Sequence, residues 1–325
     1  NIYYFKRGFN VIMKLLVFIQ FEDGKINRMS LEALACAQKY SASVTAVTFN
    51  EEAANELRNY QLEEVLLLKN ENLNIYNPLF YTEAIHTIYK EDYKALLFAH
   101  TYETRDWVPR LSVRLDIPFL SDCIDFKVAN ELAEVTRQTY QGKLNNNLVP
   151  KTNFLCSIQS GCFKIDTLKN GTSTINSVEV DLNSVTNTIN TEEKFKDQKG
   201  GVDLTAAELI VSVGRGIGKE ENLPIAQELK DVLNAELGSS RPIVDYGWLP
   251  HDRQIGSSGQ VVSPKLYFSL GISGAIQHQV GMKGSDNIMA INKDENAPIF
   301  EIADYAVIGD LLEIVPALIK KIKEN

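Results

Sequence analysis

The chain has 325 residues, a length typical of two domains. Its 44% hydrophobic and 23% charged residues are typical of a globular protein with a buried core. The formal net charge of −9 argues against nucleic acid as a partner. No uninterrupted apolar stretch approaches the roughly 18 residues of a transmembrane helix, so we expect no membrane insertion.

The N-terminus reads "NIYYFKRGFNVIMKLLVFIQF", a basic and then apolar pattern that superficially matches a signal peptide. No small-residue cleavage site follows it, and "MKLLVFIQF" is better interpreted as a first buried strand. We therefore expect Met13 to be the true start and the first twelve residues to be an extension.

Four cysteines occur without a CxxC pair. Cys156 and Cys162 are six residues apart, on what we expect to be neighbouring short strands, and this spacing fits neither a zinc nor an iron–sulfur site. All four, namely Cys36, Cys123, Cys156 and Cys162, are predicted to be reduced structural thiols, which indicates a cytoplasmic protein.

The first half alternates apolar, β-rich runs with amphipathic helical stretches. The runs are "VIMKLLVFIQF", "SVTAVTF", "EVLLLK" and "KALLFAH"; the stretches between them are "SLEALACAQKY", "EEAANELRNY" and "NPLFYTEAIHTIYK". Continuous apolar strands that alternate with helices predict a parallel sheet covered on both faces. Ser30 and Asn77-Pro78 stand where helix starts are expected.

From residue 133 to 190 the pattern becomes short, alternating and rich in turn residues, as in "EVTRQTYQGKLNNNLVP", "NFLCSIQSGCF" and "INSVEVDLNSV". We interpret this region as an antiparallel extension of the same domain. "NTINTEEKFKDQKGGVDL" then combines charge with Gly-Gly and has no apolar period, which is typical of a linker. The predicted domains are therefore residues 1–198 and 199–325.

The second domain reads as a doubly wound α/β unit. We expect strands at "AELIVSV", "RPIVDYGWL", "KLYFSL", "DNIMAINKD" and "YAVIGD", and helices at "NLPIAQELKDVLNAEL" and after "GISGA". "LLEIVPALIKKIKEN" is predicted to be a terminal helix whose basic residues lie in its last turn, where they suit the helix dipole.

One glycine turn, "VSVGRGIG", follows a predicted strand. Gly214, Gly216 and Gly218 would expose backbone N–H groups before the coming helix, which suits a phosphate. The guanidinium of Arg215 adds positive charge there. The GxGxG order is not the GxGxxG dinucleotide fingerprint, so an ordinary tight turn is the alternative interpretation.

A second turn, residues 271–274, repeats this arrangement before the predicted helix that carries Gln277 and His278. Asn292 and Asp310 come just after two further strands, where amides and carboxylates commonly bind ribose hydroxyls. Two glycine turns at the carboxyl ends of strands in one domain predict an extended ligand such as a dinucleotide.

These residues carry a resemblance to a known family. "LGSSRPIVD" and the segment from "QIGSSGQVVSPKLYFSLGISGAIQHQVGMKG" to "DYAVIGDLLEIVP" resemble the FAD-binding domain of the electron-transfer flavoprotein alpha subunit. "PRLSVRLDIPFLSD" and "TRQTYQGK" resemble the N-terminal domain of that family. The resemblance implies one FAD in the C-terminal domain, capped by a beta subunit that itself holds AMP or a second FAD.

The resemblance also implies the residues that contact the cofactor. Arg241 would lie over the isoalloxazine, Ser258 would offer its hydroxyl near flavin N5, and His278 would face O2. Ser257 and Ser258 depart from many relatives, which have Gln and then Thr. The complete expected set is Arg215, Ser240, Arg241, Gln254, Ile255, Gly256, Ser257, Ser258, Ser273, Gly274, Ala275, Ile276, Gln277, His278, Asn292, Asp310 and Leu311.

Electrostatics agrees with this resemblance. Reduced flavin carries negative charge around N1 and O2, and a guanidinium and an imidazole in a low-dielectric cleft favour that anion. A tenfold preference for the anionic form of the flavin requires only about 1.4 kcal/mol of such stabilisation. We expect Ser240 and Arg241 to begin a strand and to point into one cleft, and we interpret His86, His100 and His251 as structural.

The expected function is that of a redox carrier without a substrate, a catalytic residue or a metal of its own. The resemblance implies a heterodimer that accepts electrons from acyl-CoA dehydrogenase-type donors of fatty acid beta-oxidation and passes them to a quinone oxidoreductase. One alternative is a subunit of an electron-bifurcating flavoprotein, although no CxxCxxC ferredoxin segment is attached. Another is a non-redox module that binds NAD or ADP.

Overall fold

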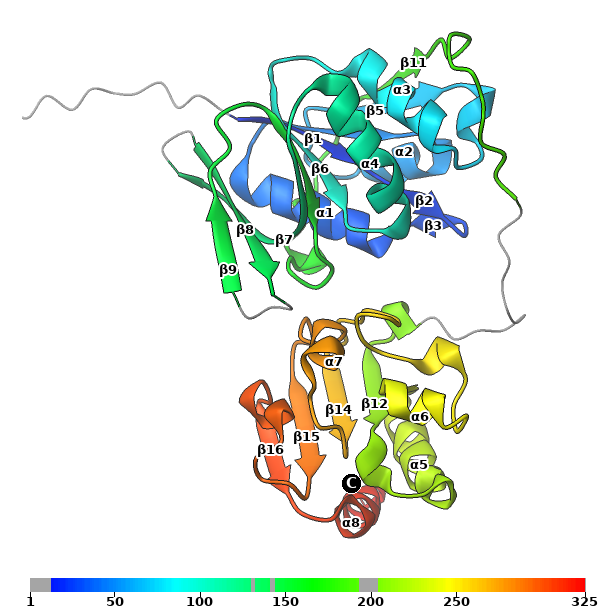
Figure 1. Ribbon diagram of the computed structural model, residues 1–325, viewed down its shortest axis with the longest axis vertical. Helices are drawn as coiled ribbons and strands as arrows, with labels where there is room; N and C mark the ends of the chain where they lie inside the picture. Colours follow the sequence, from blue (N-terminus) through cyan, green and yellow to red (C-terminus); the bar gives the residue numbers. More distant parts are fainter. Residues whose placement is uncertain (1–12, 130–131, 141–143, 193–203, 325) are drawn as a thin grey trace, which may run out of the picture. The chain divides into compact units, whose positions relative to one another are not determined.

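The computed structural model describes residues 13–129, 132–140, 144–192 and 204–324. These form two compact units, and the first ends at Glu193 (Figure 1). Both units contain a predominantly parallel sheet with helices, so the predicted α/β class is confirmed for each. The twelve-residue extension and the boundary predicted after residue 198 lie outside the described residues and stay predictions.

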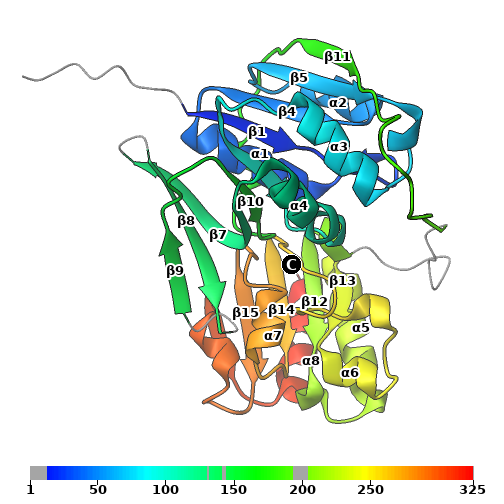
Figure 2. The ribbon, with the colours of Figure 1, turned by 45° about the horizontal axis from the view of Figure 1, so that its top comes forward.

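The N-terminal unit is built on a nine-stranded sheet of order β11-β5-β4-β1-β6-β10-β7-β8-β9 (Figure 2). The strands from β11 to β7 pair in parallel, and β7, β8 and β9 form an antiparallel meander at one end. Their bounds are β1 Lys14–Phe18, β4 Val44–Thr48, β5 Glu64–Lys69, β6 Tyr93–Ala99, β7 Phe119–Ala129, β8 Leu132–Thr139, β9 Leu144–Leu148, β10 Phe154–Ile158 and β11 Ile175–Glu179. A hairpin of β2 (Phe21–Glu22) and β3 (Lys25–Ile26) follows β1.

The antiparallel extension was predicted too broadly. Only β8 and β9 are antiparallel among the strands expected there, whereas β10 pairs in parallel with β6 and β7, and β11 pairs in parallel with β5. All five residues of β10 are buried, which is typical of a central parallel strand. Cys156 lies in β10, but Cys162 lies in the loop after it rather than on a neighbouring strand. All four cysteines are free, as predicted.

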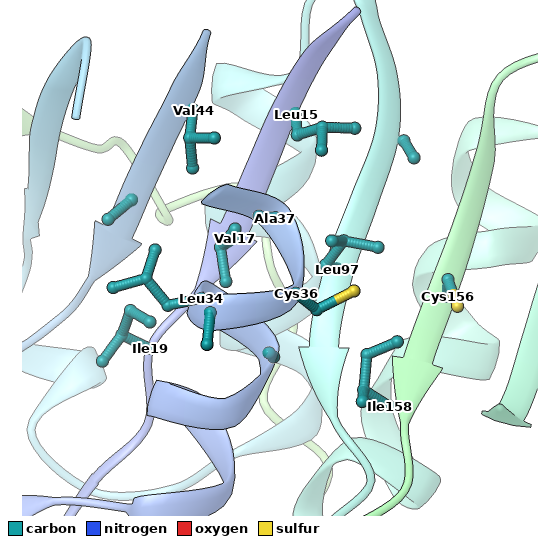
Figure 3. Packing of buried hydrophobic residues seen from close by; sticks show 14 of the residues in the cluster. Leu15, Val17, Ile19, Leu34, Cys36, Ala37, Val44, Leu97, Cys156 and Ile158 are labelled. Carbon is teal, nitrogen blue, oxygen red and sulfur yellow. The ribbon is translucent and has the colours of Figure 1, made fainter. Parts of the chain in front are cut away.

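Helices cover both faces of this sheet. They are α1 Arg28–Tyr40, α2 Glu51–Leu57, α3 Pro78–Ile88 and α4 Tyr102–Leu115. One apolar cluster joins α1 and α2 to the sheet, and a second joins α3 and α4 to its other face. In Figure 3 the α1 residues Leu34, Cys36 and Ala37 lie over Val17 of β1 and Leu97 of β6.

The helix starts follow the capping residues, with one correction. Asn77 caps α3 and Pro78 is its first residue, as predicted. However, α1 begins at Arg28, because the side chain of Asn27 accepts a hydrogen bond from the amide of Met29. Ser30 lies inside α1, and its buried hydroxyl accepts a hydrogen bond from the backbone of Gln20.

The C-terminal unit is built on a five-stranded, all-parallel sheet of order β13-β12-β14-β15-β16. Apolar clusters cover both faces: α5 and α8 pack on one, and loops that include Ile255, Met282 and Ile299 pack on the other. The bounds are β12 Leu209–Val213, α5 Leu223–Leu233, β13 Glu236–Ser239, α6 Arg241–Asp245, β14 Leu266–Leu270, α7 Ile276–Val280, β15 Ile288–Asn292, β16 Tyr305–Ile308 and α8 Leu311–Lys323. The basic last turn predicted for α8 is confirmed.

The strand expected at residues 241–249 is instead the short helix α6. The preceding strand β13 ends at Ser239, and Ser240 takes the N-cap position. Pro242 lies in the first turn of α6, where its fixed φ angle suits a helix and its missing N–H costs nothing. In the described residues of both units, no helix is long and apolar enough to cross a membrane.

The turn after β14 depends on glycine. Gly271 and Gly274 have φ angles of +64° and +80°, in the left-handed region. A Cβ atom on Gly274 would lie 2.3 Å from the backbone nitrogen of Ile299, which donates a hydrogen bond to the carbonyl of Ser273. Both conformation and space therefore exclude a side chain at Gly274.

We predict that Gly274→Ala lowers the free energy of unfolding of the C-terminal unit by about 2–5 kcal/mol, because overpacking adds to the left-handed strain. Gly247→Ala is the matched control, since Gly247 has a φ of +75° and open space around it. The control should cost about 1–2 kcal/mol, the strain alone. Hydrogen exchange of the β14 amides as a function of urea measures both, and equal losses would contradict the packing argument.

Candidate functional site

A cavity of about 660 Å³ lies in the C-terminal unit. Its walls follow the carboxyl ends of β12, β13, β14 and β15. The strand order reverses between β12 and β14, and this switch point is where open α/β sheets bind ligands. The lining residues are Arg215, Gly216, Gly218, Ser240, Arg241, Pro242, Gln254, Ile255, Gly256, Ser257, Ser258, Gly271, Ile272, Ser273, Ala275, Gln277, His278, Asn292, Lys293 and Asp294.

The two glycine turns meet at the base of this cavity. The amide of Gly214 donates to the carbonyl of Leu270, and the amide of Gly216 donates to the carbonyl of Gly271, both at 2.8 Å. A Cβ atom on Gly216 would lie 2.7 Å from the Cα of Gly271. These glycines therefore allow two backbones to touch.

The amides of Gly214 and Gly216 are thus already used and are not free for a phosphate. In addition, α5 begins only at Leu223, after two short 3₁₀ turns, so the predicted turn does not lead directly into a helix. The alternative interpretation of a tight packing turn accounts for both glycines. Arg215, between them, is exposed and lines the cavity.

Ser240 and Arg241 reach the cavity from the start of α6. The amide of Ser240 donates to the carbonyl of Val213 at 2.9 Å, which places this cap beside the turn after β12. The hydroxyl of Ser240 makes no capping hydrogen bond. The guanidinium of Arg241 is 70% exposed and lies 3.3 Å from the carboxylate of Asp245, one helical turn away.

The segment from Gln254 to Ser258 forms another wall. The amide of Ile255 donates to the carbonyl of Ser239 at 2.8 Å, and that of Ser257 donates to the carbonyl of Gln277 at 2.7 Å. The buried Gln254 donates through Nε2 to the carbonyl and the hydroxyl of Ser258, both at 3.1 Å. These bonds fix the exposed Ser258 at the rim while its hydroxyl remains able to donate.

His278 is the buried titratable group of the cavity. Its Nε2 lies 2.9 Å from the hydroxyl of Tyr267, and its Nδ1 has no hydrogen-bond partner. Burial lowers the pKa of His278 from 6.5 to about 4. The imidazole is therefore neutral near pH 7 in the chain by itself, and its effect on a bound anion stays a prediction.

The polar side chains that end β15 and follow β16 form hydrogen bonds with nearby backbone groups. Asn292 donates through Nδ2 to the carbonyl of Ile272 at 3.0 Å and accepts from the amide of Asp294. Asp310 caps α8 by accepting from the amide of Leu312 at 2.8 Å. Asn292 therefore holds two lining loops together, and contact of either residue with a ribose stays a prediction.

Most of the expected site residues line the same cavity, although they come from separate segments. Gly274, Ile276, Asp310 and Leu311 do not line it. The expected set omitted several lining residues, of which Lys293 adds a cation. Lys293 could have been predicted from the sequence, because it directly follows Asn292 at the end of a strand. The other omitted residues are Gly216, Gly218, Pro242, Gly271, Ile272 and Asp294.

Histidines outside the cavity have structural surroundings. His100 bonds through Nδ1 to the hydroxyl of the buried Ser157 at 2.8 Å, and burial lowers its pKa. His86 lies 3.4 Å from the carboxylate of Glu83 on the same helix. Within the ranges that the structure describes, no three or more His, Cys, Asp or Glu side chains form a group able to hold a metal.

Comparison with known proteins agrees with this geometry. The family described as "Electron transfer flavoprotein domain" matches residues 15–183, and the family described as "Electron transfer flavoprotein FAD-binding domain" matches residues 203–283. The second match includes most residues of the cavity. The chain is also 35% identical to the electron transfer flavoprotein subunit alpha of Bacillus subtilis over 323 residues, which cover 96% of this chain and 98% of that one.

The chain belongs to the electron transfer flavoprotein family, as an alpha-type subunit. Two relatives with other names are about as similar in sequence to this chain. Protein FixB of Clostridium saccharobutylicum is 35% identical over 95% of this chain and 96% of its own length. The acryloyl-CoA reductase electron transfer subunit beta of Anaerotignum propionicum is 32% identical over 97% of both chains.

The lowered pKa of His278 predicts a pH dependence of stability. The unfolded histidine takes up a proton near pH 6.5 and the folded one only near pH 4, so the unfolded state binds more protons between these values. This contribution is complete above pH 6.5, and about 3 kcal/mol is lost as the pH falls to 4. Urea unfolding of the wild type and His278→Gln across this range should show that difference.

The exposed His251 provides the control, and His251→Gln should keep the wild-type pH dependence. A His278→Gln variant whose stability falls between pH 6.5 and 4 as steeply as that of the wild type would refute the assignment.

Proposed function

We propose that this chain holds FAD in the cavity at the β12/β14 switch point and serves as the electron-carrying alpha subunit of a heterodimeric electron transfer flavoprotein. The observation that carries the proposal is the coincidence of this cavity with the segment that matches the family's FAD-binding domain. A volume of about 660 Å³ is within the usual range for cofactor sites.

The charges on the cavity wall favour an anionic ligand. Arg215, Arg241 and Lys293 line it, whereas among the described residues Asp294 supplies the one lining carboxylate, and His278 is neutral. This cationic wall contrasts with the net charge of −9 of the whole chain. A pyrophosphate and a reduced isoalloxazine are both anions that such a wall would stabilise.

FAD, when bound, would supply the redox chemistry, and the chain would bind, orient and tune it. Arg241 would place its guanidinium over the isoalloxazine, and Ser258 would offer its hydroxyl. Gln254 would hold Ser258 in place through its two hydrogen bonds. His278 would contribute as a neutral hydrogen-bonding group rather than as a cation.

The partner in this proposal is an electron transfer flavoprotein beta subunit that carries AMP or a second FAD. The donors would be acyl-CoA dehydrogenase-type enzymes of fatty acid beta-oxidation, and the acceptor a quinone oxidoreductase, in the cytoplasm. A second candidate is a subunit of an electron-bifurcating complex dedicated to one reductase. The relative named as an electron transfer subunit of an acryloyl-CoA reductase supports this candidate.

Co-expression with the beta subunit should give a yellow heterodimer that releases FAD on denaturation. One FAD and one AMP per heterodimer would support the carrier, and two FAD would support the bifurcating complex. The measurement is a visible spectrum with quantitative nucleotide extraction. A colourless complex that releases only NAD or ADP would instead establish the non-redox module and end the proposal.

Arg241→Ala in the heterodimer should lower the reduction potential of the flavin by about 60 mV, equivalent to a tenfold loss of preference for the reduced anion. Arg241→Lys keeps the positive charge and should restore part of the shift. Arg110→Ala is the matched control, because Arg110 also lies one helical turn from an aspartate, Asp106, but in the N-terminal unit. A spectroelectrochemical titration that is identical for Arg241→Ala and the control would refute this role.

A further inference from the structure

A buried carboxylate in the N-terminal unit takes no part in the candidate site. Glu32 begins the second turn of α1 and is only 2% exposed. Its Oε2 accepts a hydrogen bond from the amide of Gly161 at 2.6 Å, in the loop that follows β10. So short a bond from an N–H group is typical of an ionised acceptor. The carboxylate of Glu32 therefore ties this loop to α1.

Little positive charge compensates this carboxylate. Nε of Arg28, one helical turn away, lies 3.7 Å from Oε1 of Glu32, and the side chain of Arg28 is 37% exposed. Among the described residues, Arg28 is the one group whose charge shifts the pKa of Glu32. His100, after β6, and Asp122 of β7 lie 3.7 Å from each other and contribute no such charge, nor does Asp125 further along β7. The other strands that pack on α1, namely β1, β4 and β10, contribute none either.

The ionised form of Glu32 is consequently stabilised only weakly. Burial raises the pKa of Glu32 from its ordinary value of 4.5 to about 7, although the Gly161 amide and Arg28 oppose the rise. The folded state thus binds more protons than the unfolded state between these two values. The contribution of Glu32 to stability is therefore complete below pH 4.5 and is lost as the pH rises to 7. Near neutral pH both forms of the side chain are populated in the folded chain.

The loop after β10 is fixed at both ends and contacts Glu32 between them. At one end, Gln159 donates two hydrogen bonds to β7, through its amide at 2.8 Å and through Nε2 at 2.9 Å. At the other end, Phe163 is buried in the apolar cluster beneath α1. Gly161 lies between them with a φ of +79°, a left-handed conformation that glycine adopts without strain. Loss of the bond to Glu32 would therefore free residues 160–162 while both ends stay in place.

We propose that Glu32 is a pH-dependent switch, whose ionised carboxylate holds residues 160–162 against α1 and whose protonation releases them. A hydrogen bond from an amide to a carboxylate is roughly twice as strong as one between neutral groups. A carboxylic acid is the weaker acceptor, and its O–H group itself requires an acceptor. The released segment includes Cys162, which is half-buried in the closed state. The switch lies within the N-terminal unit and does not rest on the proposed function.

The test is nuclear magnetic resonance of the full chain labelled with ¹³C-carbonyl serine and ¹⁵N-glycine. The sequence contains three Ser-Gly pairs, so the spectrum reduces to the amides of Gly161, Gly259 and Gly274. Above pH 7 the Gly161 amide proton should resonate at low field, because a carboxylate deshields it. It should move to higher field as the pH falls through about 7. The amides of Gly259 and Gly274 belong to the C-terminal unit and should not follow this titration.

Glu32→Gln keeps the shape of the side chain without its charge, so the Gly161 signal should stay at high field at every pH. Glu52→Gln is the matched control, because Glu52 is an exposed glutamate on α2 of the same unit, and it should titrate like the wild type. A thermal melt establishes that each variant folds. A wild-type Gly161 signal that does not move between about pH 5 and 9 would overturn the proposal without any variant. Equal movement in folded Glu32→Gln would also overturn it, because another group such as His100 would then be the cause.

Hydrogen exchange of the same amide tests the release itself. The protection of the Gly161 amide, corrected for the intrinsic pH dependence of exchange, should fall about tenfold from about pH 8 to about pH 6 in the wild type and in Glu52→Gln. In Glu32→Gln the protection should be low at both pH values. A Gly161 signal that titrates while its protection stays constant would show that Glu32 takes up a proton without moving the loop, and this result would refute the switch.

Discussion

The contact between the turns after β12 and β14 is the constraint on which the C-terminal unit depends. The amide of Gly216 donates to the carbonyl of Gly271, and no side chain fits between the two backbones. The lining side chains come from the turns after β12 and β14, from the end of β15, and from three flanking segments, namely α6, the segment from Gln254 to Ser258, and α7. The cavity is therefore a consequence of strand order and of two glycines at contact distance.

In this wall the charged side chains are exposed, whereas the buried hydrogen-bonding group is neutral. The cations Arg215, Arg241 and Lys293 stand at the ends of strands or in the turns that follow them, whereas His278 is buried and neutral. A charged imidazole at that depth would require a compensating anion. Its hydrogen bond to Tyr267 supplies a neutral partner instead. The buried part of the wall thus stays uncharged, and the charges lie where water also reaches.

The strands and the position of the cavity could largely be predicted from the sequence, because both depend on patterns of neighbouring residues. The apolar runs predicted the parallel strands, and glycines at strand ends located the cavity. The sequence did not reveal that the amides of Gly214 and Gly216 are used by a neighbouring turn, since that pairing depends on strand order. Nor did it show that His278 is neutral, because burial is a tertiary property. The apolar run of residues 241–249 favours a strand, but Pro242 suits the first turn of a helix, and α6 forms there.

The exposure of Arg241 limits what this chain can do alone. Its guanidinium is 70% exposed and paired with Asp245, so in water its attraction for a unit negative charge at 4 Å is only about 1 kcal/mol. At the effective dielectric constant of a protein surface the same pair is worth about 4 kcal/mol. A large effect of Arg241 on a bound anion therefore requires that something else exclude water from this face. In the proposed function the beta subunit excludes water from this face. Tuning of the flavin is then a property of the heterodimer.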